Sequence, residues 1–418
     1  MGRWILSRSS IFLGLRAQKP RCFSALANDV ERVNVRNGSS GIVTIDLHNI
    51  SKISSPDPLL IYLPPYSTAF TDKPTHIPNF IKRYPTAVIN YRWKGFVPSE
   101  AGFRHPEVNK QEGEGEKGKD EDEPSHLAWP TPIHDTAEAY SWIVKNLSPS
   151  DQMRRDIYVY GSYLGASLAT SLALTETYPD EQMAIRGVAA FNGIYDWTTF
   201  LPDHKIHKEL KEVPEDIINQ QGGPDFQDLK QHVEALFQIP DNLFDHFASP
   251  SLFFCSPGLY VPAAFDASAL ACNQSPPPED ILKWFPIESP QQHRVVFPPK
   301  PELGTKKLII PETLLLHTTT PLSPRSRSIH RRWQKRKKYP GNNFESQAKH
   351  LVKGLRNGIY DTERKGSSNW DGDSSSFDDE VDRRIQVEDA GLNTGDFELG
   401  GKGEELAAIW LQEQTAGS

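Results

Sequence analysis

The sequence predicts an α/β protein with a mostly parallel, doubly wound sheet that is flanked by helices. Three observations lead to this class. Short apolar runs alternate with segments of helical spacing between residues 58 and 193. At residues 156–176, an apolar run is followed directly by a glycine-containing turn and an alanine-rich helix. The alternation stops after Trp197 and resumes near residue 311. Such alternation is typical of a parallel sheet with helices on both faces.

The predicted elements begin with a hairpin over residues 30–47, where alternating apolar residues flank Asn37-Gly38, a pair that favours a tight turn. The helix predicted at 131–147 has Thr131 as N-cap and Pro132 as its first residue. Further strands are predicted from short apolar runs, and further helices from periodic ones. The strands are 58–65, 86–92, 156–161, 185–193, 311–321 and 383–391, and the helices are 165–176, 225–237 and 403–414.

Composition divides the chain into four parts. Residues 1–23 are predicted to be a transit peptide, 24–196 the first part of the sheet domain, 197–300 an inserted proline-rich cap, and 301–418 the second part. Two polar stretches, 107–125 and 361–382, are predicted to be disordered because they are rich in charge and poor in apolar residues. A basic helix is predicted at 323–339.

The first 23 residues carry five basic residues and no acidic one, and they are rich in serine and leucine. This composition favours import into the mitochondrial matrix, with cleavage after Phe23. A disordered N-terminus or a misread start codon is the alternative. The sequence contains no run of 18 apolar residues, so no transmembrane helix is expected. The three cysteines lack a CxxC spacing, so neither a disulfide framework nor a metal or cofactor is expected.

The segment YGSYLGASLA, residues 160–169, has the pattern of a nucleophile elbow, a strained strand-to-helix turn with small residues on either side of the nucleophile. Gly161 and Gly165 are these small residues, and Tyr163 occupies the elbow position. A phenol, with a reference pKa near ~10, is a poor acyl acceptor at neutral pH. Ordinary strand-to-helix packing is the alternative explanation of the glycines.

Several motifs together resemble the α/β-hydrolase family, in its esterase/lipase branch related to hormone-sensitive lipase. IYLPPYS stands where that family has its oxyanion loop, VINYRW where a strand ends in an aromatic-arginine pair, and VYGSYLGASLATSLAL where the elbow and its helix lie. HDTAEAYSWIVKNL resembles the helix before the elbow, and ETLLLHTTTPLSP the strand that carries the acid. The resemblance implies an α/β-hydrolase sheet with an inserted cap.

The same resemblance implies that the catalytic triad is not retained. The family's serine falls on Tyr163, its acid near Thr320, and its histidine in the loop 391–401, which contains none. The oxyanion loop holds Pro64 and Pro65, which have no N–H to donate. Pro65 and Tyr66, in this former oxyanion loop, are candidate binding residues.

A rearranged site is the alternative. Ser162 or Ser167 would then be the nucleophile, with Asp196 and His317 as acid and base. Three of these residues have a structural explanation as well: Ser167 as a small residue in helix packing, Asp196 as a turn or helix cap, and His317 as a hydrogen-bonded histidine at a strand end.

The predicted basic helix contains Arg331, Arg332, Lys335 and Arg336 and no acidic residue. It could be a solvated surface helix, or a patch for RNA, for anionic lipid or for a mitochondrial protein. Two functions follow from the sequence. The first is a mitochondrial pseudohydrolase with a binding or assembly role, with an ester or metabolite as a candidate ligand of the cleft. The second is a hydrolase or acyltransferase acting on a small ester, thioester or lactone.

Overall fold

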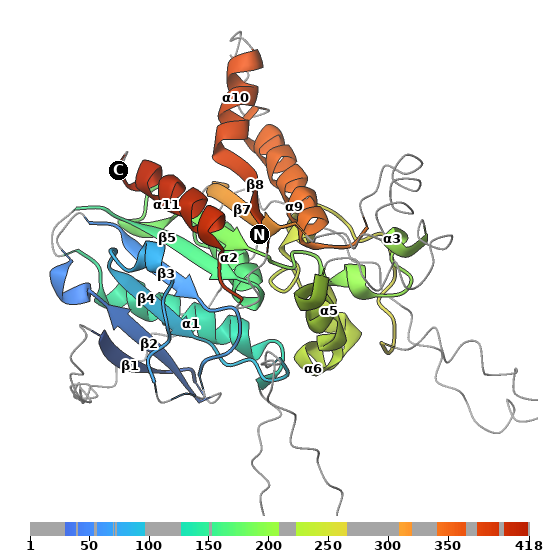
Figure 1. Cartoon of the computed structure of the whole chain (residues 1–418), viewed down its shortest axis with the longest axis horizontal. Helices are drawn as coiled ribbons and strands as arrows, with labels where there is room; N and C mark the ends of the chain where they lie inside the picture. Colours follow the sequence, from blue (N-terminus) through green and yellow to red (C-terminus); the bar gives the residue numbers. More distant parts are fainter. Residues whose placement is uncertain are drawn as a thin grey trace, which may run out of the picture.

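The computed structural model describes residues 30–38, 41–53, 57–69, 71, 73–96, 127–149, 153–208, 223–265, 309–319, 341–364, 374–392 and 397–416. Its centre is an eight-stranded sheet with the order β1-β2-β4-β3-β5-β6-β7-β8 (Figure 1). The strands are β1 (Val30–Arg36), β2 (Ile42–His48), β3 (Leu59–Leu63), β4 (Thr86–Asn90), β5 (Arg155–Ser162), β6 (Met183–Phe191), β7 (Glu312–Thr318) and β8 (Ile385–Gly391).

The sheet is antiparallel only at one edge. β1 pairs with β2, and β2 with β4, in antiparallel register, whereas all pairs from β4 to β8 are parallel. The hairpin predicted around Asn37-Gly38 is present, and Gly38 has a φ of 49°. Every residue of β3 and β4 is buried, as expected for strands covered on both faces. The predicted fold class is therefore confirmed: the architecture is of the α/β-hydrolase type.

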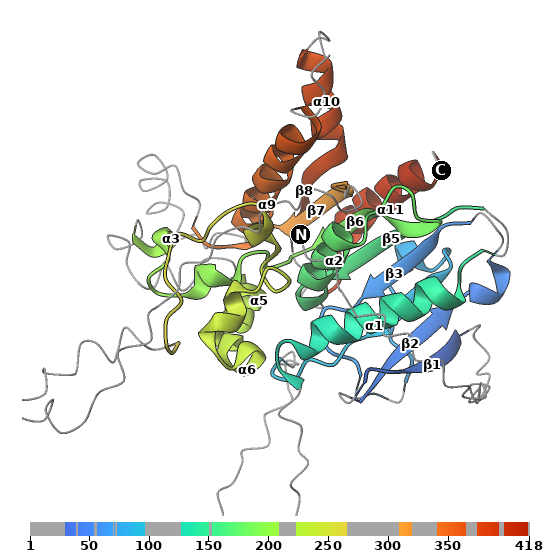
Figure 2. The same ribbon diagram turned by 180° about the vertical axis from the view of Figure 1, so that it is seen from behind.

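Helices cover both faces of the sheet. α1 (Thr131–Asn146) and α2 (Leu164–Thr175) lie on one face and α11 (Gly401–Ala416) on the other, as the two opposite views show (Figures 1 and 2). α9 (Phe344–Ile359) packs on β7 and β8, and its Leu351 shares a buried cluster with Ala166 of α2. α2 is buried along its whole length, so it forms the centre of the core behind the elbow.

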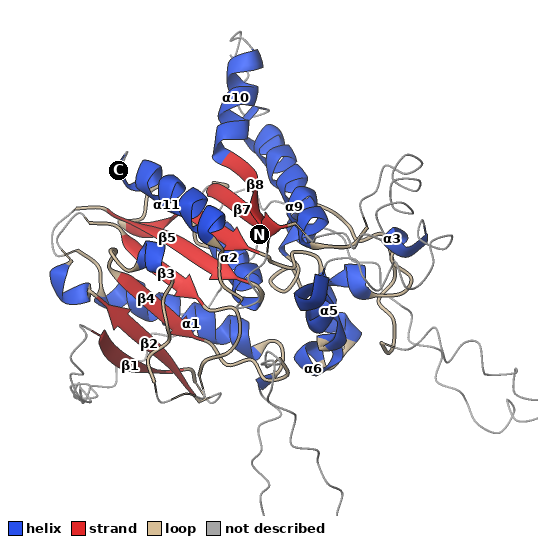
Figure 3. Ribbon diagram, in the orientation of Figure 1, coloured by secondary structure: helices blue, strands red, loops and turns tan. Residues whose placement is uncertain are grey.

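The described part of the predicted cap consists of short helices joined by loops (Figure 3). The α-helices are α3 (Lys205–Lys208), α5 (Gly223–Gln231) and α6 (Val233–Phe237). Three single-turn 3₁₀ helices accompany them: η4 (Trp197–Phe200), η5 (Pro240–Phe244) and η6 (Pro250–Phe253). Within the described residues no helix is both long enough and apolar enough to cross a bilayer.

Two expectations are corrected. The stretch 361–382 is not disordered throughout, because its second half lies in α10 (Ser374–Arg384) and residues 361–364 belong to a π-helical turn. The burial of Val381 and the ion pair of Arg384 with Glu363 hold α10 in place. Thr131 is not the N-cap of α1 but its first residue, since the capping position is Pro130. The predicted transit peptide, the insert at 107–125 and the basic helix at 323–339 lie outside the described residues.

Candidate functional site

The turn between β5 and α2 has the strained geometry of a nucleophile elbow. Tyr163 sits at the N-cap of α2 with a φ of 49° and a ψ of −112°. A bulky residue adopts a positive φ only where its surroundings enforce it. The N–H of Tyr163 donates to the carbonyl of Phe191, at 2.8 Å, which fixes the turn against the end of β6. The predicted elbow is therefore present, with Tyr163 in the nucleophile position.

The two glycines around Tyr163 have no space for a side chain. A Cβ on Gly161 would lie 2.4 Å from the carbonyl oxygen of Gly165. A Cβ on Gly165 would lie 2.3 Å from the carbonyl oxygens of both Leu63 and Pro64. Because these neighbours are backbone atoms, the close approach of α2 to the loop after β3 requires glycine.

The side chain of Tyr163 is fully buried and joins the elbow to the cap. Its hydroxyl donates to Oδ2 of Asp225 in α5, at 2.7 Å, and accepts from Nδ2 of Asn192, at 3.1 Å. Oδ1 of Asn192 in turn accepts from the N–H of Thr318, at 2.9 Å. The phenol thus lies in a hydrogen-bonded chain that links β7, the loop after β6, the elbow and α5.

Aromatic rings surround the ring of Tyr163. Phe191, Phe344 and Phe397 contact it edge-on, with centroid separations of 5.6, 5.6 and 4.9 Å. Phe397 lies in the loop after β8, the loop that the family resemblance assigns to the catalytic histidine. The elbow residue therefore packs against a phenyl ring, which cannot accept or donate a proton, in that loop.

The loop after β3 closes over the start of α2. In hydrolases with this elbow, the N–H after the nucleophile helps to bind the oxyanion. Here that N–H belongs to Leu164 and donates to the carbonyl of Pro65, at 3.2 Å. The hydroxyl of Tyr91 donates to the carbonyl of Pro64, at 2.7 Å, and so holds the loop in place. Tyr66 packs edge-on against Phe397. The structure brings Pro65 and Tyr66 to the elbow, where Pro65 presents an acceptor.

The two candidate serines are buried in other surroundings. Ser162 is 2% exposed and hydrogen-bonds to the phenols of Tyr62 and Tyr160. Burial raises the pKa values of both phenols well above their usual range. The hydroxyl of Ser167 donates to the carbonyl of Ile194, at 2.5 Å. Among the hydrogen bonds of the described residues, neither serine has a histidine partner.

Asp196 caps a turn of helix. Its Oδ1 accepts from the N–H and the hydroxyl of Thr198, at 3.1 and 2.5 Å, at the start of η4. Two histidines, the buried His204 and the half-buried His350, lie within reach of its charge. Burial lowers the pKa of His204 to about 4 and also lowers the pKa of His350, while Asp196 partly offsets both changes. The structure therefore gives Asp196 a capping role and places it near histidines that stay neutral at pH 7.

The structure also brings together a thiol and an imidazole that the sequence analysis missed. Sγ of Cys255 lies 3.9 Å from Nε2 of His350, and the two residues are 95 positions apart in sequence, so no spacing could have signalled the pair. Burial, and then the charge of Asp196, raise the pKa of the Cys255 thiol to about 11. The thiolate is thus disfavoured, which is the opposite of what an activated nucleophile requires. No group of three metal-ligating side chains occurs within the described residues.

His317 lies at the end of β7, 6% exposed and opposite Asp389 of β8 in the parallel register. Burial lowers its pKa, while the carboxylates of Glu345 and Asp389 act in the opposite direction. Its Nδ1 is buried and has no hydrogen-bond partner among the described residues. The structure places His317 near the first turns of α9, whereas the hydrogen bonds of the Tyr163 hydroxyl go to Asp225 and Asn192.

No protein-family model matches the chain, and no curated protein is similar to it. Solved structures of esterases are similar in fold. A carboxyl esterase from the fungus Tuber melanosporum is 12% identical over 98% of this chain and 94% of its own, with a TM-score of 0.42. Brefeldin A esterase, a bacterial homologue of human hormone sensitive lipase, is 14% identical over 97% and 79%, with a TM-score of 0.43. A hyperthermophilic esterase from the archaeon Pyrobaculum calidifontis is 15% identical over 53% and 61%, with a TM-score of 0.32.

Proposed function

We propose that this chain is a catalytically degenerate member of the α/β-hydrolase fold whose role is binding or assembly. One observation carries the proposal: at the elbow, the nucleophile is replaced by a buried phenol that is hydrogen-bonded to Asp225 of the cap. The neighbouring N–H of Leu164 is bonded to the carbonyl of Pro65. Both groups that would act on an ester carbonyl are thus engaged within the protein.

Ester hydrolysis by this type of elbow needs a nucleophile, a base and oxyanion donors that converge on one point. In the described residues around the elbow, the nucleophile position holds a phenol and the N–H of Leu164 is engaged. The loop that the resemblance assigns to the base places Phe397 against the phenol ring. The alternative, a hydrolase or acyltransferase for a small ester, thioester or lactone, would require Ser162 or Ser167 to gain a base. Their hydroxyls are already bonded, to two phenols and to a backbone carbonyl respectively.

A fluorophosphonate probe tests the proposal, because it labels only serines that are activated as nucleophiles. We expect no covalent label on the folded chain when intact mass is measured after incubation with excess probe. An active serine esterase in the same tube serves as the positive control. Stoichiometric label that disappears in a Ser162→Ala or Ser167→Ala variant would replace this proposal with the serine-hydrolase alternative.

We further propose that the protein acts in the mitochondrial matrix. The basic, acid-free composition of residues 1–23 supports this. A fluorescent reporter fused after residue 418 is expected to localise to mitochondria, and deletion of residues 2–23 is expected to leave it in the cytosol. A cytosolic full-length fusion would refute the location. In the matrix, Arg331, Arg332, Lys335 and Arg336 supply a positive charge suited to RNA, anionic lipid or an acidic protein.

A further inference from the structure

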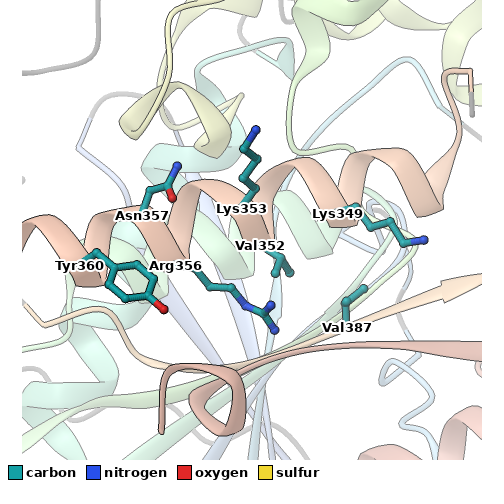
Figure 4. A pocket seen from close by; sticks show the side chains of 7 residues that line it. All are labelled: Lys349, Val352, Lys353, Arg356, Asn357, Tyr360 and Val387. Atoms are coloured by element: carbon teal, nitrogen blue, oxygen red, sulfur yellow. The ribbon is translucent and has the colours of Figure 1, made fainter. Parts of the chain in front are cut away.

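A groove runs along α9 on the side that faces β8 (Figure 4). Its volume is about 380 Å³. The residues that line it come from α9, from the turn that follows α9 and from β8: Lys349, Val352, Lys353, Arg356, Asn357, Tyr360 and Val387. The groove lies on different elements from the elbow, so it is a separate feature of the molecule.

The lining of this groove carries three cations and no acidic residue. Lys349, Lys353 and Arg356 are spaced four and three residues apart, so they lie on one face of the helix. Lys349 pairs with Glu345, and Arg356 with Asp382, and both pairs are substantially exposed to solvent. Exposed ion pairs contribute only about 0–1 kcal/mol, so an incoming anion can compete with them. Lys353 has no ion-pair partner among the described residues.

Arg356 is held in position between the helix and the sheet edge. One Nη donates to the carbonyl of Ile385, at 2.8 Å, and the other lies 3.0 Å from Asp382. Its Nε is buried without a hydrogen-bond acceptor in the described part of the chain. A guanidinium fixed in this way loses little conformational entropy on binding an anion. Figure 4 shows Arg356 and Val352 directed towards Val387, whereas Lys353 and Asn357 project from α9 in the opposite direction.

The helix dipole accounts for only one of these cations. A basic residue in the last turn of a helix is stabilised by the partial negative charge there, and Arg356 lies in the last turn of α9. Lys349 and Lys353 lie in earlier turns, where the dipole has little effect. Val352 and Val387 add an apolar surface to the groove, and Tyr360 adds an aromatic ring at one end. Positive charge beside an apolar surface suits a ligand that combines an anionic group with an apolar body.

We propose that this groove binds a small phosphate monoester with an apolar organic group. The phosphate dianion interacts with Lys353 and Arg356, and the organic group lies on Val352 and Val387. The proposal is independent of the state of the elbow, because the two sites share no residue.

Isothermal titration calorimetry of the full chain with phenyl phosphate tests the proposal. We expect saturable binding that weakens as salt is raised from 20 to 150 mM, because the contact is electrostatic. Inorganic phosphate, which lacks the apolar group, and benzyl alcohol, which lacks the charge, should each bind more weakly. Lys353→Glu should weaken phenyl phosphate binding by at least about tenfold. Lys145→Glu, at an exposed position of α1, is the matched control and should leave binding unchanged.

Three outcomes would overturn the proposal: absence of binding to the folded wild-type chain, equal losses in the Lys353 and Lys145 variants, or benzyl alcohol binding as tightly as phenyl phosphate. Thermal unfolding verifies that each variant is folded. If Lys353→Glu does not fold, Lys353→Met removes the charge while retaining a good helix former, and the same comparison applies. Because the readout is heat of binding, a negative result leaves the probe-labelling test of the elbow unaffected.

Discussion

Replacement of Gly165 by alanine is expected to lower the free energy of unfolding by at least about 3 kcal/mol, or to prevent folding. The added Cβ would lie 2.3 Å from two backbone carbonyl oxygens, those of Leu63 and Pro64. No rotamer change can relieve a contact between a Cβ and backbone. The loop after β3 would have to move away from α2, which would also break the bond from Leu164 N–H to Pro65.

Urea denaturation followed by far-ultraviolet circular dichroism measures this loss, and Gly401→Ala provides the matched control. Gly401 is the first residue of α11, and a Cβ there would meet no atom within 4 Å. That substitution should leave stability unchanged or raise it by up to about 1 kcal/mol, since alanine is the better helix former. Similar stabilities for the two variants would show that the loop after β3 is not fixed against α2.

The elbow could be predicted from the sequence because it depends on neighbours in the chain. The apolar run of β5, the two glycines and the alanine-rich helix specify the turn locally, and the structure shows the close approach that requires glycine. The buried strands were likewise predicted from runs such as TAVINYR, since a strand covered on both faces is apolar along its length. The local sequence pattern was therefore sufficient to predict a strand, or a turn that directly follows one, because neighbouring residues determine its backbone geometry.

The partners of Tyr163 could not be predicted, because they come from distant segments. Asp225 is 62 residues away in a cap helix, and Phe397 lies in an irregular loop with a φ of 57°. α9 could have been found: Asn343 and Ser346 form a capping box, and buried residues recur at helical spacing from Phe344 to Ile359. α10 could not be predicted from composition, because its many acidic and serine residues are typical of disorder. Its stability comes from contacts with other elements, such as the ion pair of Arg384 with Glu363.

Replacement of Tyr163 by serine is expected to lower the free energy of unfolding by about 3–5 kcal/mol and to produce no esterase activity. The substitution removes a fully buried ring that packs against Phe191, Phe344 and Phe397. It also removes the hydroxyl that donates to Asp225. The loop 391–401 would still offer no histidine to a serine hydroxyl at the elbow, and the N–H of Leu164 would still be bonded to Pro65.

Two further variants separate the contributions of the ring and the hydroxyl. Tyr163→Phe retains the ring and should cost only about 1–3 kcal/mol, the price of losing a buried hydrogen bond. Tyr260→Ser, at a tyrosine that is 62% exposed, should cost less than about 0.5 kcal/mol. Chemical denaturation measures the stabilities, and hydrolysis of p-nitrophenyl butyrate measures activity. If the serine variant hydrolyses the ester and a fluorophosphonate abolishes this turnover, the proposal of a catalytically degenerate elbow is wrong.

The ratio of the unfolding free energies lost by Tyr163→Phe and Tyr163→Ser shows whether the ring or the hydroxyl of Tyr163 stabilises the elbow more. If the phenylalanine variant keeps most of the stability, the ring contributes chiefly by filling the space at the elbow with apolar contacts. If it loses nearly as much as the serine variant, the stabilisation comes mainly from the bond between the phenol and Asp225, which joins α5 to the elbow. In that case the tyrosine acts as a structural link between the cap and the sheet domain, and this role alone would suffice to retain it at the elbow.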